Sequence, residues 1–336
     1  QESLEGDTYA GRFIVADIRA AVPHEPGEAL LFAAPDGLAL LAPLPEERWI
    51  CFVSLDPDPP AIDLVDPPEP AQVSALLDRR SGLAAGLHDM RWASLFAMHR
   101  RIAHRLGDGR RFLMGDAAHL SSPIGGEGLN SALMDAADIA WKLALVLRGA
   151  ARPTLLDSYA IERGLADRHV LEVSDTLHRS VAALGAACAA GAMPPQQSAE
   201  TALAAARARA MLDIVYEGSP LIGEHRGAGL LQEVPAGRPR PGERLPDRIR
   251  LSGPAHHLLV FGDHPGLARL RARWAGLVEI VDGAAAGFDP ARAGVAPGGA
   301  VLVRPDGFIG FRALPLTAEG LAALDAHLAS YLSPGP

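Results

Sequence analysis

A glycine-rich stretch in the first half of the chain, residues 115–130, constrains the fold more than any other feature. It has the sequence GDAAHLSSPIGGEGLN. The apolar run before it, residues 111–114, predicts a buried strand that stops at Gly115. The three glycines near its end lack a Cβ atom, so the backbone can turn sharply and lie against a flat ligand. A helix is expected to begin at Leu129, and the free amide groups at its entrance would face the same ligand.

An acidic residue, Asp116, directly follows the predicted strand. Ligands of open α/β sheets bind at the carboxyl ends of the strands, where a carboxylate can accept hydrogen bonds from sugar hydroxyls. We therefore expect Asp116 to bind the hydroxyl groups of a ligand.

These residues resemble the second FAD-binding motif of the flavin-dependent aromatic hydroxylases, the para-hydroxybenzoate hydroxylase type of monooxygenase. The match spans residues 115–142 and consists of Gly115, Asp116, His119, Pro123, Gly126, Gly128, Asn130, Asp135, Trp141 and Lys142. Glu127 replaces a frequent Gln and Asp138 a frequent Asn. The resemblance implies FAD binding by Gly115, Asp116, Pro123, Gly126, Glu127, Gly128, Leu129 and Asn130.

The resemblance also implies roles for these residues. Asp116 would hold ribityl or ribose hydroxyls, Pro123 would pack beside the reactive face of the flavin, and residues 126–130 would contact its pyrimidine edge. In such enzymes NAD(P)H reduces FAD, and dioxygen supplies the oxygen atom that is added to an aromatic ring. Because the cofactor carries this chemistry, we expect no catalytic protein nucleophile. His119 has no identifiable partner in the sequence and is interpreted as a structural residue of the loop.

Residues 1–114 contain no G-x-G-x-x-G turn, the element that holds the ADP half of FAD in this family. Residues 1–17 instead resemble the segment that enters the substrate sheet. We therefore expect a family member without its dinucleotide-binding front, and hypothesise that the isolated chain binds FAD weakly or not at all. Its expected partners are an aromatic small molecule and either a second copy of the chain or the missing N-terminal segment.

Short apolar runs at residues 13–18, 29–32, 38–42 and 49–55 predict an antiparallel sheet, with a hairpin turn at residues 34–37. Residues 71–87 predict a helix, and residues 89–99 alternate as another strand of the sheet. Trp92, Phe96 and Met98 fall on one side of that strand. With Pro123 they are expected to line the pocket for an aromatic substrate, although packing in the core would explain them equally well.

The second half of the chain is dominated by helical patterns. Residues 129–148 predict one helix, and an apolar stripe over residues 156–177, interrupted by Arg163, predicts a longer one. Residues 182–211 are rich in alanine and predict two antiparallel helices separated by Pro194 and Pro195. We expect residues 1–226 to form the FAD-binding and substrate domain, residues 227–250 a linker, and residues 251–336 a thioredoxin-like domain.

The predicted order of that last domain is strand, helix, strand, hairpin and helix. It resembles the C-terminal domain of the larger aromatic hydroxylases that act on polycyclic polyketides. It contains no Cys-x-x-Cys, so we expect a scaffolding or interface role and no redox chemistry. The expected fold class is α/β with α+β character: a partial FAD/NAD(P)-binding hydroxylase fold with an antiparallel substrate sheet.

The composition excludes several function classes. A net charge of −9 argues against a nucleic-acid surface, and no apolar run is long enough for a membrane span. The two cysteines, Cys51 and Cys188, form no metal or redox pattern, so a cytoplasmic location is expected. We predict no metal site, because His256 and His257 would point to opposite faces of a strand.

Two interpretations remain open. The first is an FAD-dependent monooxygenase that hydroxylates a phenolic or polyketide substrate and whose N-terminal portion is absent. The second is a non-catalytic paralogue or interaction module that retains the substrate sheet and the thioredoxin-like domain. The sequence leaves the substrate, and the choice between NADH and NADPH, undetermined.

Overall fold

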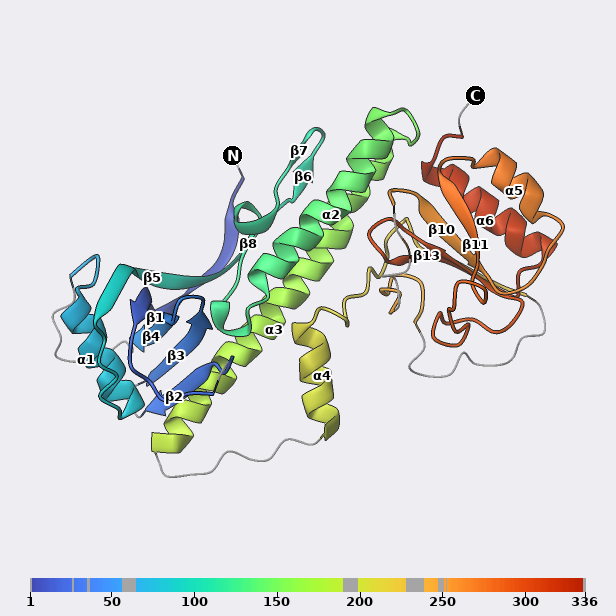
Figure 1. The fold of residues 1–336 in the computed structure, drawn as a ribbon. Coiled ribbons are helices and arrows are strands. Elements are labelled where there is room, and N and C mark those ends of the chain that lie inside the picture. The colour runs from blue at the N-terminus through green and yellow to red at the C-terminus, as the bar shows by residue number, and fades with distance from the viewer. Residues whose placement is uncertain are drawn as a thin grey trace.

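The computed structural model describes residues 2–25, 27–34, 37–55, 65–189, 199–227, 239–246, 251 and 253–334. Two β-sheets lie at opposite ends of the molecule, and two long helices, α2 and α3, run side by side between them (Figure 1). Both sheets contain residues that the sequence predicted to be strands, and the helix pair contains residues that it predicted to be helical.

The N-terminal sheet has six strands in the order β2-β3-β4-β1-β5-β8, with every neighbouring pair antiparallel. Its strands are β1 (Leu4–Arg19), β2 (Leu30–Ala34), β3 (Gly37–Leu44), β4 (Arg48–Leu55), β5 (Asp89–Ala103) and β8 (His119–Leu120). The prediction of an antiparallel sheet is therefore confirmed. Ala34 pairs with Gly37 across the predicted hairpin, whose turn residues 35 and 36 lie outside the described residues.

Helix α1 (Pro70–Ser81) covers one face of this sheet. Its buried side chains pack with inward-facing residues of the strands, such as Ile14 on β1. Alternation places Ile14 and Phe13 on opposite faces, so the second face carries aromatic side chains. The prediction extended this helix to residue 87, but it ends at Gly82, which adopts a left-handed conformation with φ of 67°.

The predicted buried strand at residues 111–114 is wrong. Only β7 (Arg111–Phe112) forms there, and it pairs antiparallel with β6 (Gly107–Asp108) in a separate two-stranded ribbon. Gly109, in a left-handed conformation, lies in the tight turn between them, and Arg111 is exposed. Phe112 and Leu113 of the apolar run are partly buried and pack against the cluster that contains Tyr159. Asp116 does not lie at the carboxyl end of a strand in an open α/β sheet.

The helices follow the predicted periodicity closely. Helix α2 (Gly128–Leu147) ends before a left-handed Gly149, and α3 (Asp157–Ala189) is longer than its predicted stripe. The first of the two helices predicted within residues 182–211 is the end of α3, and the second is α4 (Ala199–Arg209). The break predicted at Pro194 and Pro195 lies outside the described residues. No helix in the described ranges combines the length and the apolar character needed to cross a membrane.

The C-terminal sheet has the order β11-β10-β12-β13-β9. Its elements are β10 (His256–Val260), α5 (Leu267–Arg273), β11 (Val278–Asp282), β12 (Ala300–Val303), β13 (Ile309–Leu314) and α6 (Ala318–Tyr331). Parallel pairing of β10 with β11, followed by the antiparallel hairpin and α6, gives the predicted thioredoxin-like order. Strand β9 (Gly223–Arg226) adds parallel to β13, although it precedes the expected linker.

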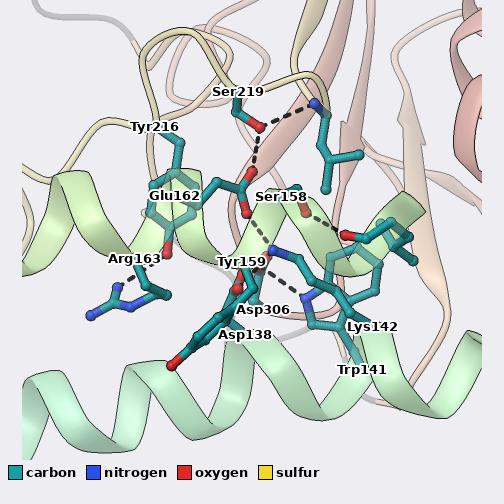
Figure 2. Close-up of polar contacts among 12 residues, drawn as sticks. Asp138, Trp141, Lys142, Ser158, Tyr159, Glu162, Arg163, Tyr216, Ser219 and Asp306 are labelled. Carbon is teal, nitrogen blue, oxygen red and sulfur yellow. Dashed lines mark hydrogen bonds and ion pairs between the residues drawn. The ribbon is translucent and has the colours of Figure 1, made fainter. Parts of the chain in front are cut away.

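A buried ionic network joins α2 and α3 to the hairpin of the C-terminal sheet. Lys142 on α2 lies 2.7 Å from both Asp138 and Glu162. From the hairpin, Arg304 lies 2.5 Å from Glu162 and 3.2 Å from Asp138, and it also pairs with Asp306. Figure 2 shows Lys142 and Glu162 directed toward each other from neighbouring helices, with Asp306 beside Trp141. We call these five charged residues the interdomain network.

The charges of the network are unequal, since three carboxylates face two cations. Burial opposes ionisation of Glu162, but Arg304 and Lys142 hold its pKa below the ordinary value. Against the same burial, Arg304 lowers the pKa of Asp306 to about 2. Burial and the neighbouring carboxylates raise the pKa of Asp138 despite Lys142. Of the five residues in the network, Asp138 is therefore the carboxylate whose neutral, protonated form is most favourable.

We predict that Arg304→Met destabilises the chain by about 3–5 kcal/mol, because it leaves Glu162 and Asp306 buried with Lys142 as their single cationic partner in the network. The variant Asp138→Asn should cost less than Arg304→Met, since it removes an excess negative charge and its amide oxygen can still accept from Lys142 or Arg304. Denaturant unfolding of the three proteins measures both values. Equal losses for the two variants would contradict this account of the charges.

Candidate flavin site

The loop between β7 and α2 consists of short turns. Residues Gly115–Ala117 and Pro123–Gly125 each form a 3-10 turn, and β8 lies between them. The side chain of Asp116 is exposed on the first turn, and Pro123 is exposed at the start of the second. The predicted cofactor residues therefore lie in one continuous loop, although no parallel sheet supports it.

Buried charges anchor this loop to the two long helices. His119 is buried, and its Nε2 atom lies 2.9 Å from Asp135 of α2, which also accepts a hydrogen bond of 3.0 Å from the Gly115 amide. Arg163 of α3 donates to Asp135 at 2.6 Å and to Asp167 at 2.9 Å. Arg163 thus belongs to the buried stripe of α3, where the sequence suggested an interruption.

The charge state of His119 follows from these neighbours. Burial disfavours the imidazolium, but the hydrogen bond to Asp135 and the charge of Asp167 raise its pKa above the ordinary value. Sequence analysis found no partner for His119. Asp135 could have been recognised as this partner, because it belongs to the same motif and falls on the predicted helix.

The entrance of α2 presents backbone toward the loop. The first intrahelical hydrogen bond joins the amide of Ser131 to the carbonyl of Glu127, so the amides of residues 128–130 have no acceptor within the helix. Gly126 is left-handed, with φ of 74°, and a Cβ atom there would meet no described heavy atom within 4 Å. The backbone is therefore open on one side at Gly126 and carries partial positive charge at the helix entrance.

Glu127 turns inward beneath this surface. Its side chain is only 1% exposed, and neither carboxylate oxygen has a hydrogen-bonding partner from another described residue. A Cβ atom at Gly125 would lie 1.9 Å from the carboxylate, so the Glu127 side chain would have to move if residue 125 carried one. Burial raises the pKa of Glu127. The loop therefore contains a buried carboxylate whose ionisation is energetically unfavourable.

The aromatic face of the N-terminal sheet lies next to the loop. Phe13 stacks on Phe52 with ring centroids 5.0 Å apart and contacts Phe96 at 6.1 Å. Met98, on the same face of β5, lies 3.7 Å from the hydroxyl of Ser122, the residue before Pro123. Of the expected pocket residues, Phe96 and Met98 thus lie close to the loop. Trp92 pairs with Asp17 farther along β5 and is largely exposed.

Two groups of buried acidic and histidine side chains are close enough to share a metal ion: His119 with Asp135 and Asp167, and Asp138 with Glu162 and Asp306. Cationic side chains of the protein already neutralise both groups. Arg163 contacts the first, and Lys142 and Arg304 contact the second. Both groups are therefore explained as ion-pair networks.

Comparison with known proteins shows the family of the chain. Residues 4–174 match the family described as FAD binding domain, and residues 238–334 match the family described as aromatic-ring hydroxylase, C-terminal. The chain belongs to the FAD-binding aromatic-ring hydroxylases. The expected family, its fold class and its FAD cofactor are thereby confirmed.

Relatives of this chain are named as monooxygenases. The 6-methylpretetramide 4-monooxygenase of Streptomyces rimosus is 33% identical over 81% of this chain and 54% of its own length. Tetracenomycin A2 monooxygenase-dioxygenase of Streptomyces glaucescens is 30% identical over 94% of this chain and 57% of its own length. The chain spans little more than half the length of these relatives.

Solved structures show the same relationship. Anhydrotetracycline hydroxylase from Streptomyces rimosus superposes with a TM-score of 0.69 at 26% identity, covering 99% of this chain and 66% of that one. Aklavinone-11 hydroxylase, solved with FAD and aklavinone, gives a TM-score of 0.70 at 26% identity, covering 97% and 63%. The arrangement of both sheets and the helix pair is thus shared with structures of this family.

The chemistry of the loop residues is compatible with the isoalloxazine end of FAD. The open backbone at Gly126 allows a planar ring to approach, and the amides of residues 128–130 can donate to carbonyl groups on its edge. The exposed carboxylate of Asp116 can accept hydrogen bonds from hydroxyls of the cofactor chain. The inward-turned Glu127 leaves this surface free.

We predict that Glu127→Gln stabilises the chain by about 1–3 kcal/mol at pH 8, because it removes a buried carboxylate that has no hydrogen-bonding partner among the other described residues. The raised pKa sets the pH dependence. Below pH 4.5, the ordinary value, Glu127 is protonated in both the folded and the unfolded state, so the two proteins should unfold alike. As the pH rises through the raised folded pKa, ionisation favours the unfolded state and the advantage of glutamine grows.

Thermal unfolding between pH 4 and pH 8 measures this difference. The exposed Glu172→Gln on α3 is the matched control and should leave the unfolding temperature nearly unchanged at each pH. A pH-independent effect of Glu127→Gln, or a loss of stability at pH 8, would show that Glu127 has partners in solution.

Proposed function

We propose that this chain is the substrate-binding and flavin-facing part of an FAD-dependent monooxygenase that hydroxylates a phenolic or polyketide ring with NAD(P)H and O2. When bound, the reduced flavin supplies the oxygen-activating chemistry. The observation that carries the proposal is the contact between the glycine loop and the aromatic sheet face, made where Ser122 meets Met98. A flat ring bound on the aromatic face next to this contact would lie beside the flavin-facing backbone.

The residues of the chain would divide the work. Asp116 would hold ribityl or ribose hydroxyls, and Pro123 would pack beside the reactive face of the flavin. The amides of residues 128–130 would donate to the pyrimidine edge and stabilise negative charge on the reduced ring. Phe96 and Met98, with Trp92 at the outer end of β5, would orient an apolar aromatic substrate and exclude water.

A partner segment is also part of this proposal. Along one side of α2, Leu129, Leu133 and Leu147 are 72%, 60% and 82% exposed, with the exposed Ala137 and Ala140 between them. An apolar helix face of this kind is typical of an interaction surface. We propose that a dinucleotide-binding segment, supplied in the same polypeptide or by another, covers this face and holds the ADP half of FAD. The buried free thiol of Cys51 is consistent with work in the cytoplasm.

The test is co-expression of the chain with the dinucleotide-binding segment of a homologous monooxygenase. The purified complex should contain stoichiometric FAD by its visible absorption. It should also oxidise NAD(P)H faster when a phenolic polyketide is present and add one oxygen atom to that substrate. A stable flavin-free complex would favour a non-catalytic interaction module.

The glycine loop offers a matched pair of variants for this assay. Gly126 and Gly149 have similar left-handed conformations, with φ of 74° and 70°, and a Cβ atom at either would meet no described atom within 4 Å. Both alanine variants therefore carry the same backbone strain of about 1 kcal/mol. We predict that Gly126→Ala lowers flavin occupancy at least about tenfold more than Gly149→Ala. Equal occupancies would exclude direct flavin contact at Gly126.

A further inference from the structure

A tyrosine whose hydroxyl proton is already used in a hydrogen bond lies at the edge of the aromatic sheet face. Tyr9 of β1 donates a hydrogen bond of 2.8 Å from its hydroxyl to Oδ1 of Asp175 on α3. The other oxygen of Asp175 pairs with Arg179 at 2.9 Å. Asp175 thus accepts from Tyr9 through one oxygen and pairs with Arg179 through the other, and the proton of Tyr9 is directed toward Asp175.

This pair lies next to the flavin-facing loop. The imidazole of His178 stacks on the ring of Tyr9, with centroids 4.0 Å apart, and meets Phe13 edge-on at 6.3 Å. Its Nδ1 atom lies 3.1 Å from the hydroxyl of Ser122, the residue before Pro123. Tyr9 is therefore connected to the aromatic face on one side and to the loop on the other.

The hydrogen-bonding capacity left on Tyr9 is specific. A phenolic hydroxyl has one proton and two acceptor lone pairs, and Asp175 already binds the proton. Burial and the neighbouring Asp175 raise the pKa of Tyr9, so its oxygen stays protonated and neutral. The ring itself is only half-buried. What Tyr9 offers to a ligand is thus an acceptor and no donor.

We propose that the Tyr9–Asp175 pair selects a ligand hydroxyl group, so that the aromatic face accepts a phenol and discriminates against its methyl ether or a ketone at the same position. An ether or carbonyl oxygen facing Tyr9 would have no proton to share, and two acceptors would be left unpaired against each other. The inference rests on the proposed function only in placing an aromatic ligand on this face. Tyr9 and Asp175 are positioning residues in this account.

The experiment measures binding to the flavin-free 336-residue chain, by fluorescence titration, of 2-naphthol and of its methyl ether, 2-methoxynaphthalene. The chain should bind the phenol about tenfold more tightly than the ether. Tyr9→Phe should bring the ratio close to one by weakening the binding of the phenol. Asp175→Asn should shift the preference toward the ether, since its amide can donate to Tyr9 and free the tyrosine proton for the ligand.

Thr176→Ala on the exposed side of α3 is the matched control and should keep the wild-type ratio. Circular dichroism of each variant verifies that it is folded. Equal ratios in the wild type and Tyr9→Phe, or binding of neither probe to the folded chain, would overturn the proposal. Phenol selectivity in the chain, together with a complex that stays flavin-free after co-expression with the dinucleotide-binding segment, would refute the proposed monooxygenase and leave this inference standing.

Discussion

The buried ionic network between the helix pair and the C-terminal hairpin is the interaction on which the rest of the structure depends. Glu162 lies between Lys142 and Arg304, so one carboxylate joins α2, α3 and the thioredoxin-like domain. Such groups stabilise only when every member is paired, because desolvation of an isolated charge costs several kcal/mol. The network therefore fixes the position of the C-terminal domain on the two helices. Apolar packing alone would define this position less well, because it does not require one particular arrangement of hydrogen bonds.

A second set of buried charged residues connects the two helices to the glycine loop. Arg163 lies one position after Glu162 on α3 and contacts Asp135, which in turn holds His119 and the Gly115 amide. Tyr216 links the two sets, since it accepts a hydrogen bond from Arg163 and stacks on Phe308 of the C-terminal domain. The helices that contact the C-terminal domain thus also hold the glycine loop in place.

Much of the fold could be predicted from the sequence because its signals are local. Short apolar runs predicted strands within β1 to β4, alternation predicted β5, and the order of the C-terminal elements followed from short apolar runs separated by turns. The four-residue run at 111–114 was mistaken for a buried strand, since the sequence does not show that a left-handed Gly109 folds it into an exposed ribbon. Strand β9 was missed because its partner, β13, lies far along the chain.

The site was predictable in part for the same reason. The loop residues could be found because glycine, proline and aspartate have distinctive backbone or charge requirements. Their supports could not, since Arg304 and Asp138 are far apart in sequence and meet only after folding. Arg163 looked like a defect in an apolar stripe, yet it is fully buried among carboxylates. Tyr9, Asp175 and His178 carried no local signal, because their relation exists only between β1 and α3.

The central claim is that the backbone at the entrance of α2 meets the isoalloxazine ring. An amide chemical-shift map of the isotope-labelled chain, titrated with FMN to millimolar concentration, tests it most directly, because it reports contact residue by residue even when binding is weak. The account predicts that the largest shifts fall on the amides of residues 125–130. Shifts confined to the C-terminal sheet, or none along the loop, would contradict it.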